Sequence, residues 1–162
     1  MGNGANFKEL EKLRKQLEKL NAEQLQTFNE KSIKELAARL LAKVIERTLP
    51  GIYDKKSGKK GGTLRRGWTS KTADEARAGS GDGVDARDYA EAVEVKKVGN
   101  VYQIEIINPV EYASYVEYGH RKRNGGWVEE KLMLTISETE LRENAPKILQ
   151  RKLDKFLGDA FK

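Results

Sequence analysis

Apolar residues recur every three or four positions in the first part of the chain, and Lys and Glu fill most positions between them. The pattern first steps by 3, 3, 4 and 3 positions, along Phe7, Leu10, Leu13, Leu17 and Leu20. This spacing is typical of one apolar stripe on an amphipathic helix. Helical spacing continues from Leu25 to about Arg47 and ends before Pro50, because proline cannot continue a helix. Residues 1–49 are therefore predicted to be helical.

Residues 50–91 have a different character, since they are polar, basic and rich in glycine. Between Gly51 and Gly62 the chain consists mainly of Lys, Gly and Asp. Residues 63–69 are predicted to form a short strand, and residues 70–90 a long polar loop. The segment as a whole predicts basic and polar loops with one short strand.

Alternation replaces helical spacing in residues 92–108. Gly99-Asn100 joins two runs, 92–98 and 101–107, in which Val93/Val95 and Tyr102/Ile104/Ile106 alternate with polar neighbours. A two-residue turn between alternating runs is typical of an antiparallel hairpin whose strands are half-buried. A hairpin is therefore predicted over residues 92–108.

The remaining residues predict a turn-rich segment over 109–130 and a helical segment over 131–162. The aromatic run from Tyr112 to Tyr118 suits a short helix or tight turns, and Gly119 stops it. Pro146 either kinks the last helix or begins a new one. The order of helix, strands and helix predicts an α+β fold in a single domain, 1–162. In this fold a small antiparallel sheet packs against a long N-terminal helix and a C-terminal helix.

Composition then narrows the chemistry. The 162 residues contain no cysteine, which excludes disulfides, zinc–thiolate sites and a cysteine nucleophile. The chain contains one histidine, His120. Six residues separate Gly51 from Gly58, where a phosphate-binding loop needs four. The acidic residues at 82, 85 and 88 lack the spacing of a calcium loop. We therefore expect no catalytic residues, no cofactor, no metal and no enzymatic activity. No apolar run is long enough to span a membrane.

The net charge of +6 is concentrated in two glycine-rich loops. The candidate contact residues are Lys55, Lys56, Lys59, Lys60, Arg65 and Arg66 in the first, and Arg121, Lys122 and Arg123 in the second. Such clusters attract phosphate without reading base sequence. They suit either nucleic acid or an acidic protein partner, and the alternative is a solvated surface that aids solubility. The nearby Trp68, Tyr112, Tyr115, Tyr118 and Trp127 are interpreted as core or interface anchors.

Three ordered motifs carry a resemblance to a known family. The first contains Leu64, Arg65 and Trp68, the second runs from Asn108 through Tyr112, Ala113, Tyr115, Val116, Glu117, Tyr118, Gly119 and His120, and the third contains Trp127. Together they resemble the tailed-bacteriophage tail-component family of small neck or head–tail joining proteins. The lysine-rich stretch 51–61 departs from the usual family pattern.

The resemblance implies a non-enzymatic virion structural protein that acts in head–tail joining, the neck or tail completion. It implies assembly in the bacterial host cytoplasm, contacts with connector and tail proteins, and a homo-oligomeric ring. The alternative function is a sequence-independent DNA-binding module that uses the basic loops. Within the second motif, Tyr112, Tyr115 and Val116 are expected to bury against the sheet, Gly119 to adopt a left-handed backbone, and Glu117 to pair with Arg121 if the segment is helical.

Overall fold

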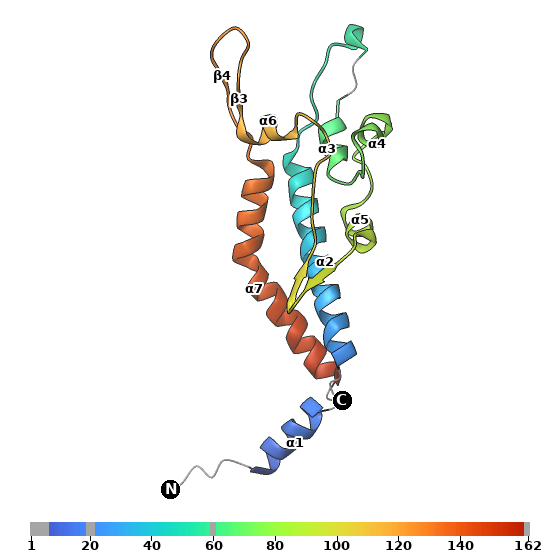
Figure 1. Cartoon of the computed structure of the whole chain (residues 1–162), viewed down its shortest axis with the longest axis vertical. Helices are drawn as coiled ribbons and strands as arrows, with labels where there is room; N and C mark the ends of the chain where they lie inside the picture. The colour runs from blue at the N-terminus through green and yellow to red at the C-terminus, as the bar shows by residue number, and fades with distance from the viewer. Residues whose placement is uncertain (1–6, 19–21, 59–60, 161–162) are drawn as a thin grey trace.

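Two long helices form the frame of the molecule in the computed structural model, which describes residues 7–18, 22–58 and 61–160 (Figure 1). Helix α2 spans Ala22–Arg47 and helix α7 spans Met133–Ala160, and the two pack along each other in opposite directions. Pro146 lies inside α7, which continues through it. A shorter helix, α1 (Phe7–Glu18), lies beyond the end of the pair at which α2 begins.

Helix α2 contributes four buried residues, namely Ser32, Ala37, Leu41 and Val44. Leu41 and Val44 are fully buried, and Met133 and Ser137 of α7 are buried as well. Polar contacts flank these residues, since Glu140 of α7 accepts hydrogen bonds from both Lys43 and Arg47. Burial of apolar side chains at about 25 cal/mol per Å² drives this packing. The predicted long N-terminal and C-terminal helices are confirmed as α2 and α7, whereas residues 1–6, 19–21 and 161–162 of the predicted helical segments lie outside the described residues.

The polar segment after α2 contains helices instead of the predicted strand and loop. Helix α3 (Thr63–Gly67) replaces the strand, and α4 (Ala73–Ala78) and α5 (Ala86–Ala92) lie in the predicted loop. Both predictions were wrong. Helix α4 begins at a capping box formed by Thr72 and Glu75, and Asp85 caps α5. These caps satisfy backbone N–H groups that would otherwise lack partners. A single turn of 3-10 helix, η1 (Lys55–Ser57), precedes them.

The predicted hairpin forms around Gly99-Asn100, but its strands are shorter than predicted. Strand β1 (Lys96–Val98) pairs antiparallel with β2 (Val101–Gln103), and the start of the predicted run belongs to α5. The expected alternation continues past the ladder, because Tyr102, Ile104 and Ile106 are half-buried between exposed neighbours. Strand β2 contacts α2. The α+β fold is therefore confirmed.

A second hairpin, absent from the prediction, follows helix α6 (Ala113–Tyr118). Strand β3 (His120–Arg121) pairs antiparallel with β4 (Trp127–Val128), and Gly125 and Gly126 both have positive φ in the turn. Of the two alternatives predicted after Asn108-Pro109, a short helix or tight turns, the structure has the short helix, α6. The second hairpin then returns the chain to the start of α7 (Figure 1).

Candidate functional site

Two loops project beyond the same end of the α2–α7 pair (Figure 1). One follows α2 and carries η1, and the other is the β3–β4 hairpin that precedes α7. They share an end because α2 and α7 run in opposite directions, so the residues after the first helix lie near those before the second. We call this region, residues 49–58 and 112–128, the loop end.

Exposed aromatic side chains gather at the loop end. Among the described residues, every large aromatic side chain classed as exposed belongs to it: Tyr53, Tyr112, Tyr115, Tyr118 and Trp127. Two exposed aliphatic residues, Leu49 and Ile52, lie on the same loop as Tyr53, and Ile52 is 99% exposed. Isolated apolar side chains are common on protein surfaces, but clusters of them mark contact sites.

The expected burial of Tyr112 and Tyr115 against the sheet is wrong, since the two residues are 42% and 59% exposed. Only Val116 of the three is half-buried and packed against the core. The three tyrosines of the motif recur every third residue, which places them along one side of α6. The structure turns this side outward. Partial burial raises the pKa of the Tyr112 phenol, and Tyr53 adds to the shift.

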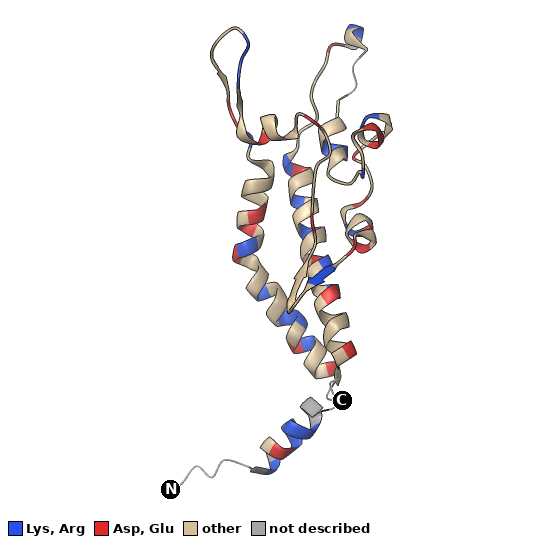
Figure 2. Cartoon of the chain, in the orientation of Figure 1, with Lys and Arg blue, Asp and Glu red and all other residues tan. Residues whose placement is uncertain are grey.

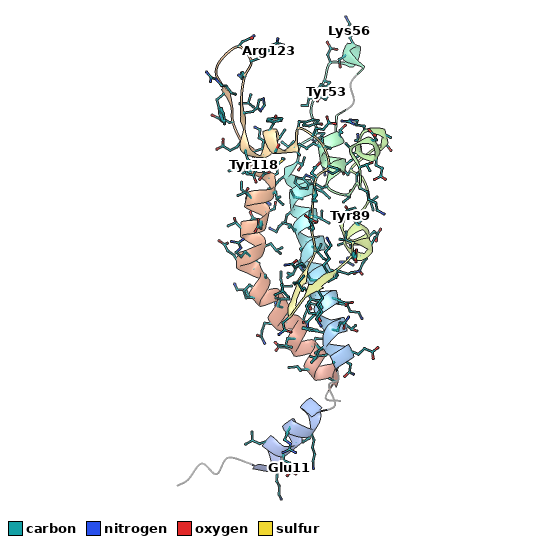
Figure 3. The ribbon with its side chains drawn as sticks, viewed as in Figure 1. Glu11, Tyr53, Lys56, Tyr89, Tyr118 and Arg123 are labelled. Atoms are coloured by element: carbon teal, nitrogen blue, oxygen red, sulfur yellow. The ribbon has the colours of Figure 1, made fainter. Side chains whose placement is uncertain are left out.

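Basic side chains occupy both tips of the loop end. Lys56 is exposed in η1, and Arg121, Lys122 and Arg123 are exposed on the β3–β4 hairpin. Figure 2 shows basic residues at both tips, and Figure 3 labels Lys56 and Arg123 there. Lys55 lies in η1, and Lys59 and Lys60 are outside the described residues. The structure thus brings members of both predicted basic clusters to one end.

Arg66 does not belong to that basic surface, which corrects its interpretation as a contact residue. It is 4% exposed, and its Nε donates a hydrogen bond of 2.8 Å to the carbonyl oxygen of Ala76. Its Nη1 lies 3.3 Å from the carbonyl oxygens of Gly61 and Gly81. Arg66 therefore joins three parts of the segment between residues 61 and 81. Arg65 forms an ion pair of 3.2 Å with Asp82.

Two other motif residues hold the fold. The indole Nε1 of Trp68 donates a 2.8 Å hydrogen bond to Oγ1 of Thr48, just after α2. The Asn108 amide donates to the carbonyl oxygen of Leu64 at 2.8 Å, and its Oδ1 accepts from the N–H of Val110 at 3.1 Å. These hydrogen bonds fix α3 between α2 and the chain that leaves the first hairpin.

Glu117 has a structural role that the sequence did not indicate. It is 5% exposed, and its carboxylate accepts hydrogen bonds from the N–H groups of Leu134 and Thr135 at 3.0 and 2.9 Å. The Thr135 hydroxyl adds a third at 2.8 Å. A carboxylate at a helix N-terminus satisfies free N–H groups and opposes the positive end of the helix dipole. The expected pair with Arg121 is therefore wrong, because Glu117 caps α7 instead.

Gly119 and His120 connect α6 to the second hairpin. Gly119 has a φ of 74°, as expected, and a Cβ there would lie 2.5 Å from the carbonyl oxygen of Val128. The His120 ring packs edge-on against Tyr115 with ring centroids 5.7 Å apart. This arrangement fixes the hairpin relative to α6 and its exposed tyrosines.

The described residues contain no group of three or more His, Asp or Glu side chains arranged to hold a metal ion. In the same ranges, every helix is too short or too polar to cross a membrane.

Comparison with known proteins places the chain among bacteriophage tail components, through a family model that matches residues 11–119, or 109 of the 162 residues. The chain belongs to the HK97 gp10-like family, which is described as "Bacteriophage HK97-gp10, putative tail-component". A tail component is a structural class of virion protein and not an enzyme class. No curated protein and no solved structure matches the chain.

The family match confirms the resemblance derived from the motifs. It includes Trp68, Asn108 and Glu117, and it stops at Gly119. The β3–β4 hairpin with its three cations, Trp127 and α7 all lie beyond the matched range. The third motif, which contains Trp127, therefore lies outside the matched range.

Proposed function

We propose that the protein is a non-enzymatic structural component of the virion that acts in head–tail joining, the neck or tail completion. In this role the loop end binds a neighbouring neck or tail protein, and copies of the chain assemble into a ring. The observation that supports the proposal is the gathering of exposed aromatic and basic side chains at one end of a member of a tail-component family.

The composition of the loop end suits protein binding. Tyr, Trp and Arg are the residue types enriched in interfaces, and a few such residues supply most of the binding energy. Tyr118 is 63% exposed and Trp127 is 56% exposed; Trp127 pairs with Arg121 across the hairpin, and Tyr118 lies three residues before Arg121. A neighbouring protein that covers these rings would bury apolar area, and the Arg121 guanidinium would donate hydrogen bonds at the edge of the contact.

The test is a pair of substitutions in the phage or prophage that carries the gene. The double variant Tyr118→Ser and Trp127→Ser is expected to produce heads and tails that electron microscopy finds unjoined or defective. Val98→Ser with Val101→Ser is the matched control, because these residues are 63% and 56% exposed on the first hairpin. Normal infectious particles from the Tyr118 and Trp127 variant would refute a loop-end contact. Normal particles from a deletion of the gene would refute the virion role itself.

A second candidate function is non-specific DNA binding by the loop end. The observation that favours it is the exposure of Arg121, Lys122 and Arg123 together on one hairpin. The slope of log K against log salt is negative, and each phosphate that a variant no longer neutralises reduces its magnitude by about 0.9 for duplex DNA. The triple change of these residues to Ser should therefore reduce both low-salt affinity and that slope. No retention of the unmodified chain on duplex DNA at low salt would rule this function out.

The control for the DNA experiment removes the same charge elsewhere. Lys12, Lys147 and Arg151 are exposed on α1 and α7. Changing these three to Ser leaves the net charge equal to that of the hairpin variant. Equal loss of DNA binding in both variants would show that net charge, and not the loop end, causes the attraction.

A further inference from the structure

The end of the molecule opposite the loop end contains an open apolar groove. It lies between the first turns of α2 and the last turns of α7 and has a volume of about 480 Å³. Phe28 of α2 and Phe156 of α7 form its apolar part, with ring centroids 4.7 Å apart. Three lysines also line it, namely Lys31, Lys152 and Lys155, together with the acidic residues Glu23 and Asp159. The groove therefore offers aromatic surface beside charges of both signs, with the lysines in excess by one.

Helix α1 is an amphipathic helix that extends away from the groove of its own chain (Figure 1). Leu10, which belongs to its apolar stripe by sequence spacing, is 55% exposed. Isolated helices shorter than about 12–15 residues are marginal in water, and α1 has 12 residues. Packing of the stripe against another apolar surface would supply the missing stability.

The charges of α1 match those of the groove. At about 100° per residue, sequence spacing places the glutamates at 9, 11 and 18 beside the apolar stripe. The same spacing places the lysines at 8, 12 and 15 on the opposite side of the helix and Arg14 within the stripe. Glu11 forms an exposed ion pair with Lys15, which is weak and easily exchanged. A helix lying in the groove by its stripe would thus bring glutamates next to the groove lysines and Arg14 toward the side that also contains Glu23 and Asp159, and leave its own lysines in solvent.

The lengths also match. Twelve helical residues extend about 18 Å, and the nine residues of α2 from Glu23 to Lys31, which include its contribution to the groove, extend about 13 Å. All the residues that line the groove belong to α2 and α7, so α1 of the same chain does not occupy it. Because α1 extends away from its own groove, its stripe is presented to a neighbouring molecule.

We propose that the groove binds helix α1 of a second copy of this chain. Each copy provides one α1 and one groove, so the contact runs head to tail and can close into a ring. The inference rests on the proposed self-assembly of the protein, and it identifies which surfaces of the two copies meet. It does not involve the loop end.

The absence of cysteine from the chain permits a direct test. Full-length Leu10→Cys and full-length Thr27→Cys are mixed and oxidised, since Thr27 lines the groove and Leu10 is in the stripe. We expect a disulfide-linked dimer in which mass spectrometry finds residue 10 joined to residue 27. The control replaces Leu10→Cys with Lys12→Cys, which is exposed on the other side of α1. The control is expected to cross-link at least ten times more slowly.

The double variant Leu10→Cys with Thr27→Cys separates the two possible arrangements of α1. A cross-link within one chain, with no product in the mixture of single variants, would show that α1 occupies its own groove and would overturn the proposal. Equal cross-linking by Leu10→Cys and Lys12→Cys would also overturn it, because random collision explains that result.

Light scattering then relates the contact to assembly. Leu10→Asp is expected to lower the solution mass of the full-length chain, and Lys12→Asp to leave it unchanged. If Leu10→Asp assembles as the unmodified chain does and still joins heads to tails, the α1 contact is refuted while the virion role stands. If gene deletion leaves infectious particles normal, the virion role is refuted whatever the cross-linking shows.

Discussion

Replacement of Glu117 by Ala should destabilise the protein strongly. Glu117 belongs to the motif that carries the family resemblance, and its role there is to cap α7. The substitution removes the acceptor for the N–H groups of Leu134 and Thr135 and for the Thr135 hydroxyl. Because Glu117 is 5% exposed, water reaches these groups poorly after the change.

The magnitude follows from the hydrogen bonds that the substitution removes. A buried donor left without a partner costs about 1–3 kcal/mol, and removal of an N-terminal cap costs about 0.5–2 kcal/mol. Two backbone donors at the lower value, together with the missing interaction with the helix dipole, give about 3 kcal/mol. Glu117→Gln keeps the shape and one carbonyl oxygen but turns its NH₂ toward a donor, so its destabilisation should be about half as large.

The assay is urea unfolding at pH 7, followed by circular dichroism, for Glu117→Ala, Glu117→Gln and Glu129→Ala. Glu129 is exposed next to β4 and serves as the control, with an expected change within about 0.5 kcal/mol. A free energy of unfolding for Glu117→Ala within about 0.5 kcal/mol of the unmodified protein, on the scale of surface substitutions, would refute the capping role. A full loss of stability in Glu117→Gln with none in Glu117→Ala would refute the hydrogen-bond reasoning as well.

Three further predictions concern α3 and the contact between α2 and α7. Gly67→Ala places a Cβ 2.2 Å from Oδ1 of Asn108 and should cost about 1–3 kcal/mol in urea unfolding, whereas Gly158→Ala, with nothing within 4 Å, should be neutral or stabilising. Arg66→Lys cannot reproduce the planar set of donors and should cost about 1–3 kcal/mol in the same assay. Hydrogen bonds from two basic side chains hold the pKa of Glu140 below its ordinary 4.5, so its stabilising effect is present above that pH and disappears as the pH falls through the lowered value. The free energy of unfolding of Glu140→Gln should therefore be lower than that of the unmodified protein at pH 7, and the two values should converge in acid.

The elements predicted correctly from the sequence are those with a sustained period. Helices α2 and α7 repeat their apolar spacing over many turns, and Gly99-Asn100 defines the turn of the first hairpin. Residues 63–69 are too few for the spacing of their apolar residues to distinguish a helix from a strand. Leu64 and Trp68 are four apart, which suits a helix, but Leu64, Arg66 and Trp68 also alternate as a strand would. Hydrogen bonds with Thr48 and Asn108, distant in sequence, select the helix.

The candidate site was predictable only in part, because charge type does not reveal environment. Arg66 looks like its neighbours in the basic cluster, yet its partners are backbone carbonyl groups at residues 61, 76 and 81. Glu117 likewise lies in a run of mostly exposed residues. The common position of the two loops could be predicted from the order of elements, since one loop follows the first long helix and the other precedes the last. Antiparallel packing of those helices is enough to bring the loops to one end.

The frame would allow one small chain to make both of the proposed contacts. The groove ends at Lys31, so the 16 residues of α2 from Ser32 to Arg47 separate it from the loop end by about 24 Å. Polar contacts join α2 to α7 near both ends, through Lys152 and Glu35 at one and Arg47 and Glu140 at the other, with the fully buried Leu41 between them. Sites this far apart without shared partners contribute independently. A second copy in the groove and a different protein on the loop end can therefore bind together, because neither contact uses the surface or the side chains of the other.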